Sequence, residues 1–235
     1  MPAQMRTSLE SDITIVVGQE GSLQDEYDRL ATDFDMRGFS ASFVLDGTPS
    51  PTLNAHKPLV GGNHISVNGL GMNIAGIGKP ALSNHVAGLV MDITNVRLSG
   101  WSGGSGVAAS EGATINLKEW MIFCNGDGDH ILAYYGGRIF IQKDYTVEGG
   151  GLNHWHSFSD GYITATDLKV SINSGIWFTR WAGVADASII ARNVVYQGTI
   201  NGSQYLVHRN GFMEIGNAVL PGNVAGTVLT GGVVG

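Results

Sequence analysis

Aromatic and histidine side chains gather in one stretch of the chain, residues 120–181. The faces of aromatic rings pack well against sugar rings, while nearby planar polar groups hydrogen-bond sugar hydroxyls. A surface row of such side chains would therefore suit a glycan. The residues expected to bind it are Tyr134, His154, Trp155, His156, Trp177 and Trp181. The alternative is that these side chains pack against one another inside a regular fold.

Two pairs of aspartates have a spacing that could serve a glycosidase. Asp144 and Asp167 are 23 residues apart, and Asp160 and Asp186 are 26 apart. A glycosidase needs two carboxylates about 5–5.5 Å or 6.5–9.5 Å apart. A chain that returns on itself at this interval would bring each pair together, although aspartate is also an ordinary turn residue. A lyase could instead use Arg180 or Arg192 as its base, but few acidic residues are available to bind the calcium ion that it would need.

Metal ligands are sparse. The run Asn125-Gly-Asp127-Gly-Asp129-His130 begins like a calcium loop, with Asp127 and Asp129 as the candidate ligands. Its sixth position is His130 where the loop needs Gly, and its twelfth is Gly136 where it needs Glu. His154 and His156 could share a strand face, but no third zinc ligand is evident. We therefore expect a glycine-rich turn here, and no metal or cofactor.

An alternating apolar motif recurs along the chain at nearly constant spacing. Its first residues are Ile65, Met91, Ile115, Ile139, Ile163, Ile189 and Met213, at intervals of 26, 24, 24, 24, 26 and 24 residues. Alternation of this kind predicts a short strand with one buried face. Asn, Asp or Gly often follows, and these residues tolerate the backbone of a sharp corner.

The repeat predicts an all-β fold, a right-handed single-stranded parallel β-helix of about seven coils spanning residues 61–218. Strands that return to one position every ~25 residues stack about 4.8 Å apart, so the seven motif residues should form one interior column. A sandwich or barrel is the alternative, but its strands recur every 8–12 residues. The Leu and Asn pattern of a leucine-rich repeat is absent.

Both ends differ from the repeat. Residues 1–60 should cap the β-helix. Within them we expect strands at 12–17 and 40–45 around an amphipathic α-helix at 23–37, which begins at the N-cap Ser22 and ends before Gly38. Residues 219–235 have no charged or aromatic side chain, so we expect this tail to pack on the β-helix or at a subunit interface.

Composition excludes several functional classes. The net charge is −7, which argues against a nucleic-acid partner. No apolar run is long enough for membrane insertion. Cys124 is the only cysteine, so no internal disulfide can form. The start of the sequence lacks the apolar stretch of a signal peptide.

Both ends of the sequence resemble a known group of proteins. The motifs are Asp33-Phe34-Asp35-Met36-Arg37-Gly38-Phe39, Asp46-Gly47-Thr48 and, near the C-terminus, Leu220-Pro221-Gly222-Asn223-Val224-Ala225-Gly226-Thr227. Together with the repeat, they resemble right-handed β-helix tail-fibre and tailspike-like proteins of phages and prophages, within the pectate-lyase-like superfamily. One departure is that Gly21-Ser22 leads directly into the helix, where the family usually has Asp and Asn.

The resemblance implies a virion component made in the host cytoplasm. It implies a homotrimer with a structural or host-surface glycan-binding role, alongside other virion tail proteins. The alternative on the same fold is a polysaccharide depolymerase, either a hydrolase or a lyase. Fold alone does not decide between them.

Overall fold

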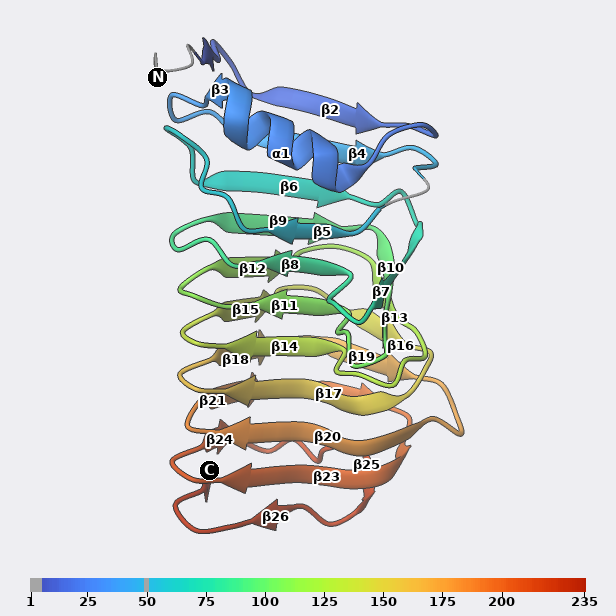
Figure 1. The fold of residues 1–235 in the computed structure, drawn as a ribbon. Helices are drawn as coiled ribbons and strands as arrows, with labels where there is room; N and C mark the ends of the chain where they lie inside the picture. The colour runs from blue at the N-terminus through green and yellow to red at the C-terminus, as the bar shows by residue number, and fades with distance from the viewer. Residues whose placement is uncertain (1–5, 49–50) are drawn as a thin grey trace.

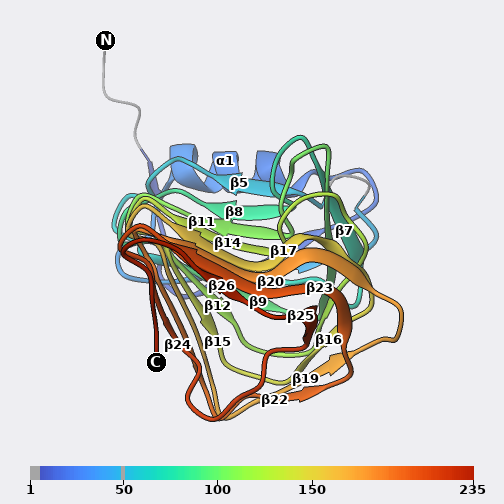
Figure 2. The ribbon, with the colours of Figure 1, turned by 90° about the horizontal axis from the view of Figure 1, so that it is seen from below.

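The chain winds into a right-handed parallel β-solenoid of about nine turns, as Figures 1 and 2 show. The computed structural model describes residues 6–48 and 51–235, so residues 1–5 and 49–50 of the expected cap lie outside the described residues. Three parallel sheets form its sides. Each coil contributes one strand to each sheet in turn, apart from the coils at the two ends.

The three sheets have ten, nine and six strands. The ten-stranded sheet contains β2 (Ile13–Val17), β4 (Ala41–Leu45), β6 (His64–Asn68), β9 (Val90–Thr94), β12 (Thr114–Leu117), β15 (Arg138–Ile141), β18 (Tyr162–Thr166), β21 (Ser188–Arg192), β24 (Phe212–Glu214) and β27 (Val233–Val234). The six-stranded sheet contains β7 (Asn73–Ile77), β10 (Val96–Trp101), β13 (Met121–Phe123), β16 (Tyr145–Val147), β19 (Lys169–Ile172) and β22 (Val195–Gln197).

The nine-stranded sheet faces the viewer in Figure 1. It contains β5 (Leu53–Ala55), β8 (Leu82–Asn84), β11 (Val107–Ala109), β14 (Ile131–Tyr134), β17 (Gly151–Phe158), β20 (Trp177–Ala185), β23 (Ile200–His208), β25 (Gly222–Val224) and β26 (Thr227–Val228). Two short strands, β1 (Thr7–Ser8) and β3 (Phe34–Asp35), pair with each other beside the first coils.

The predicted interior column is confirmed. Successive members are register partners in the ten-stranded sheet, from Ile65 opposite Met91 to Ile189 opposite Met213. All seven side chains are fully buried. The expected seven coils are too few, because Ala41 stacks before Ile65 and Val234 stacks after Met213.

One helix, α1 (Leu23–Asp33), covers the first coil. It lies beside β5 where other coils place a strand of the nine-stranded sheet (Figures 1 and 2). Gln24 Oε1 accepts a 2.8 Å hydrogen bond from the Asn54 backbone N–H, so the helix satisfies part of the open strand edge. At 11 residues, this only helix of the described chain is too short to span a bilayer.

The helix ends four residues earlier than its apolar pattern predicts. Ser22 is the N-cap, as expected, and its hydroxyl accepts from the Asp25 N–H. Phe34 already has extended backbone angles, because Phe34–Asp35 pairs with Thr7–Ser8. The pairing with β1 therefore replaces the last helical turn expected before Gly38.

The C-terminal tail, residues 219–235, continues the winding. Its strands β25 and β26 pair with β23, and β27 pairs with β24. Its apolar side chains are only partly covered: Val219, Val224, Val228, Leu229 and Val233 remain exposed.

Glycine-rich loops between the six- and nine-stranded sheets stack backbone against backbone. A Cβ on Gly128 would lie 1.7 Å from the Gly104 carbonyl oxygen, and one on Gly126 would lie 2.2 Å from that of Gly100. No side chain fits between these loops. Close stacking therefore requires glycine in the Asn125–His130 turn.

We expect Ile139→Ala to lower the free energy of unfolding by about 2–5 kcal/mol, because it opens a cavity in a ladder with neighbours above and below. Ile77→Ala is the matched control, since Ile77 is 69% exposed and should cost no more than about 0.5 kcal/mol. Denaturant unfolding followed by circular dichroism measures both. Equal losses of unfolding free energy in the two variants would show that the interior column is not a main source of stability.

Candidate functional site

Three of the six expected glycan-binding residues lie inside the solenoid. His154, Trp155 and Trp181 are fully buried, so the expectation of a surface row is wrong for them. The alternation of β17 breaks where the adjacent residues His154 and Trp155 are both buried. His154 packs against Trp181 with ring centroids 4.2 Å apart. These side chains fill the core, as the packing alternative supposed.

His154 also belongs to a buried chain of hydrogen bonds whose proton positions can be assigned. His130 Nε2 lies 3.3 Å from the Gly150 carbonyl oxygen, which can only accept, so that nitrogen carries the hydrogen. His130 Nδ1 therefore accepts from His154 Nδ1 at 2.9 Å. His154 Nε2 then accepts from the Tyr145 hydroxyl at 2.7 Å, and that hydroxyl accepts from Trp155 Nε1 at 3.2 Å. Every link is satisfied with both imidazoles neutral.

Burial holds both imidazoles in the neutral form. Desolvation lowers the pKa of His130 to about 4 and that of His154 well below its usual value. The neighbouring His130 lowers the pKa of His154 further. Burial also raises the pKa of the Tyr145 hydroxyl well above its usual value. These hydrogen-bonded side chains therefore belong to the core, and their contribution to the stability of the fold depends on pH.

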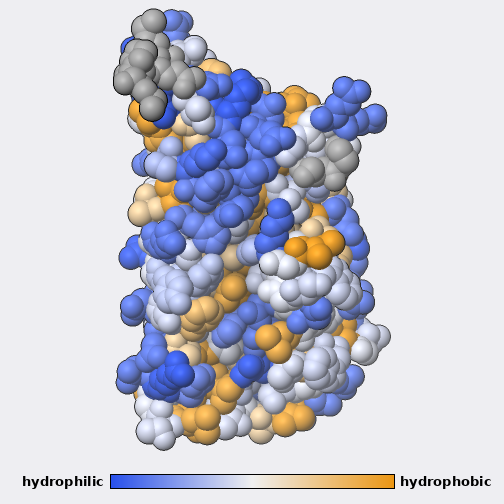
Figure 3. Space-filling model, in the orientation of Figure 1, coloured by the Kyte–Doolittle hydropathy of each residue, from blue (hydrophilic) through white to orange (hydrophobic). Residues whose placement is uncertain are grey.

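Tyr134 and His156 lie on the outer face of the nine-stranded sheet, which Figure 3 views from outside. The Tyr134 ring stacks on Phe158, one coil further along, with centroids 5.3 Å apart and planes at 21°. His156 lies beside Phe158, 5.2 Å between centroids. These partly exposed rings form a short aromatic row across two coils.

The candidate metal ligands do not converge. Asp127 Oδ1 accepts from the Gly103 backbone N–H at 3.2 Å. Asp129 is almost fully buried, and its two oxygens accept from Asn153 Nδ2 at 2.5 Å and from His156 Nδ1 at 2.7 Å. Across the described ranges, no three His, Cys, Asp or Glu side chains are placed to hold a metal ion.

Trp177 is 60% exposed and lines a hollow of about 690 Å³ at the start of β20. A second hollow of about 350 Å³ adjoins it and shares Asn125 and Glu148 with it. Trp101, 43% exposed, lines this second hollow. We call the two hollows together the Glu148 groove. Its two tryptophans stand three coils apart, about 14 Å along the solenoid axis.

An ion pair lines the Glu148 groove. Arg97 Nη2 is 2.5 Å from Glu148 Oε2, and each side chain is about one-third exposed. Asn73, Asn125 and Asp127 add polar groups along the walls. Cys124 also lines the groove, and burial raises the pKa of its thiol, which disfavours the reactive thiolate.

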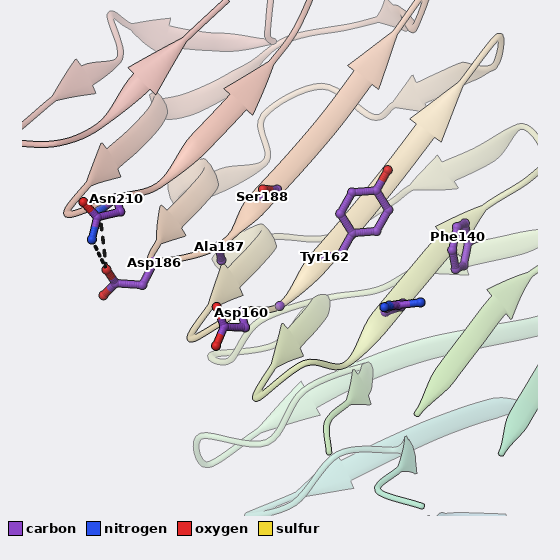
Figure 4. Close-up of a pocket in the computed structure, with 9 residues that line it drawn as sticks. Phe140, Asp160, Tyr162, Asp186, Ala187, Ser188 and Asn210 are labelled. Carbon is purple, nitrogen blue, oxygen red and sulfur yellow. Dashed lines mark hydrogen bonds between the residues drawn. The ribbon is translucent and has the colours of Figure 1, made fainter. Parts of the chain in front are cut away.

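Asp160 and Asp186 come together on successive corners beside the ten-stranded sheet, where they line a hollow of about 750 Å³ (Figure 4). The Asp160 N–H donates to the Asp186 carbonyl oxygen at 2.6 Å. The Asp186 carboxylate accepts from Asn210. Tyr162 and Phe140 line the same hollow, with ring centroids 6.0 Å apart.

Asp144 and Asp167 also line one hollow, of about 500 Å³, together with the half-exposed Trp120. Both carboxylates are used in corner hydrogen bonds. Asp144 accepts from the Lys169 N–H and Asp167 from Asn193 Nδ2, each at 2.8 Å. This pair therefore fits the turn role expected of aspartates at corners.

The two candidate lyase bases have different surroundings. Arg192 pairs with Glu214 through two hydrogen bonds of 2.5 and 2.8 Å. Arg180 lies on β20 opposite Asn153, and its Nε atom is buried without a hydrogen-bond partner.

Sequence reasoning missed Trp101, Arg97 and Glu148. Arg97 and Glu148 are 51 residues apart, about two coil periods, which is a signal the repeat could have supplied.

Comparison of the chain with protein-family models, with curated proteins and with solved structures finds no match in any of the three.

We expect acid to destabilise the fold through the buried histidine chain. His130 has a folded pKa of about 4 against 6.5 for a free histidine, so the unfolded chain binds the proton first as pH falls through this window. Stability is thus retained above pH 6.5 and lost between pH 6.5 and 4, by about 2 kcal/mol at pH 5 from His130 alone.

His130→Gln tests this dependence, because the amide can still accept from His154 but does not titrate. The variant should be less stable at pH 7.5, and its Tm should fall less steeply between pH 7 and 5. Thermal unfolding of both proteins across this range measures the difference. Parallel curves would show that other groups cause the acid sensitivity.

Proposed function

We propose that this chain is a subunit of a phage-type virion tail fibre or spike, and that it binds host-surface glycan in the Glu148 groove. The observation that carries the proposal is the groove itself, two adjoining hollows that each have an exposed tryptophan in their lining. It runs across several coils, so it suits a chain-like ligand better than a compact one.

The side chains of the groove have the chemistry that sugars require. Trp101 and Trp177 offer flat apolar faces for sugar rings. Carboxylate, guanidinium and amide groups of Glu148, Arg97 and Asn125 line the same groove and can accept hydrogen bonds from hydroxyls or donate to them. The rigid solenoid beneath holds these groups in place, so little ordering is required on binding.

The virion assignment draws on the fold and on the terminal motifs that resemble tail-fibre and tailspike-like proteins. A β-solenoid is a stiff shaft with long lateral faces, and three such faces can bury one another. We therefore propose a homotrimer that associates with other virion tail proteins.

A second candidate function is cleavage of the same glycan by a polysaccharide depolymerase. The hollow that contains Asp160 and Asp186 favours it, because two carboxylates lie on adjacent corners beside Tyr162 and Phe140. Release of reducing ends or unsaturated sugars from host polysaccharide, lost in Asp160→Asn and Asp186→Asn, would favour this function over binding alone.

Trp177→Ala and Trp101→Ala should each weaken binding of host-surface polysaccharide about tenfold or more, because each removes a stacking platform worth about 0.5–1.5 kcal/mol plus its buried area. Isothermal titration against extracted polysaccharide measures the change. Trp120→Ala is the matched control, since Trp120 is 49% exposed but outside the Glu148 groove. Loss of binding in the Trp120 variant alone would move the site to the hollow of Asp144 and Asp167.

The homotrimer predicts a solution mass of about three times the 24.8 kDa chain. Size-exclusion chromatography with light scattering measures it directly. A single-chain mass at micromolar concentration would contradict the trimer and leave glycan binding to be judged by the tryptophan variants.

A further inference from the structure

A carboxylate–imidazole pair lies on the outer face of the nine-stranded sheet. Asp129 is 8% exposed, and both its oxygens are engaged, one by Asn153 Nδ2 and the other by His156 Nδ1. Since a carboxylate only accepts, His156 Nδ1 carries a hydrogen. The opposite edge of the ring, with Cδ2 and Nε2, therefore points away from Asp129. The His156 side chain is 26% exposed, so part of the ring is within reach of a ligand.

Arg180 lies beside this pair without an anionic partner. It is the register neighbour of Asn153, and a bulge between Trp177 and Arg180 shifts β20 against β23. Bulges of this kind redirect side chains and are frequent next to binding sites. No ion pair forms with Arg180 anywhere in residues 6–48 and 51–235, and its Nε atom is buried without a partner. Asn153 Oδ1 is likewise buried and unpartnered.

Gly183 brings these side chains around one point. A Cβ at Gly183 would lie 3.2 Å from Asn153 Oδ1, 3.3 Å from His156 Cδ2 and 3.7 Å from Arg180 Cδ. The backbone angle of Gly183 is not one that requires glycine, since it is absent from the positive-φ residues. Glycine is instead favoured here because even a methyl group would press on Asn153 Oδ1 and on the His156 ring edge, so the three side chains approach one another closely at this point.

We propose that His156 and Arg180 bind an oxyanion, carboxylate or phosphate, carried by the glycan. Arg180 supplies a charged, planar fork of donors that matches such a group. His156, held by Asp129 at Nδ1, supplies a second donor to the oxyanion when Nε2 also carries a hydrogen. Asn153, buried beneath them, holds the Asp129 carboxylate through Nδ2.

The surroundings favour a sugar as the carrier of this oxyanion. The stacked rings of Tyr134 and Phe158 adjoin His156 on the same face. Leu152 and Thr179, which line the Glu148 groove, directly precede Asn153 and Arg180 in the sequence. The identity of the carrier rests on the proposed function, whereas the oxyanion site rests on its own side chains.

Titration of the full chain, labelled with ¹⁵N-histidine, tests the site at pH 6. The probes are sodium glucuronate, glucose 6-phosphate and inorganic phosphate, with glucose as the neutral control. The three anions should shift the ring ¹⁵N signals of His156 saturably, while glucose at equal concentration should not. His156→Gln assigns these signals. Comparison of glucuronate with the two phosphates shows which oxyanion is preferred.

Arg180→Gln should weaken anion binding roughly tenfold or more, because it removes a charge-assisted fork. Arg209→Gln is the control, since Arg209 is 69% exposed and lies near Asp186. Equal shifts with glucose, or unchanged affinity in Arg180→Gln with its Tm preserved, would overturn the proposal. If the Trp101 and Trp177 variants keep full glycan binding while phosphate still titrates His156, the groove assignment fails and the oxyanion site stands.

Discussion

In-register hydrogen bonding between successive parallel strands is the constraint from which the rest of this molecule follows. Each coil must return its backbone to one position about 4.8 Å from the last. Residues at equivalent positions then share one environment, and for this reason the column from Ala41 to Val234 is apolar throughout. The same constraint arranges surface chemistry in rows parallel to the axis. It explains why each hollow on this protein draws its side chains from neighbouring coils.

Most of the architecture could be read from the sequence, because a repeat of this kind reports the same environment many times. The column Ile115, Ile139 and Ile163 needed only period and alternation. The missed coils lie where the period is disturbed. Ile13 precedes Ala41 by 28 residues because α1 occupies the place of a strand, and Val234 follows Met213 by only 21. The helix end was misjudged because pairing with Thr7–Ser8 is a distant contact that no local pattern reports.

The sites were less predictable, because period alone does not say which way a side chain points. Alternation would place either His154 or Trp155 outside, yet both are buried in β17. Trp177, in a similar stretch of sequence, is exposed. The Glu148 groove joins residues from coils far apart in sequence, since Trp101 and Trp177 are separated by 76 residues. Locating it requires knowing where each coil turns its corner.

The buried chain of hydrogen bonds from Trp155 Nε1 to the Gly150 carbonyl oxygen has one direction of donation. An imidazole can exchange its tautomer and a hydroxyl can rotate, so a free chain of such groups could reverse all its hydrogens together. Here an indole N–H that can only donate closes one end, and a carbonyl that can only accept closes the other. Reversal would leave two donors facing each other at one end and two acceptors at the other. The interior therefore holds a single polarised arrangement of these hydrogens, a fixed dipole among the aromatic side chains of the core.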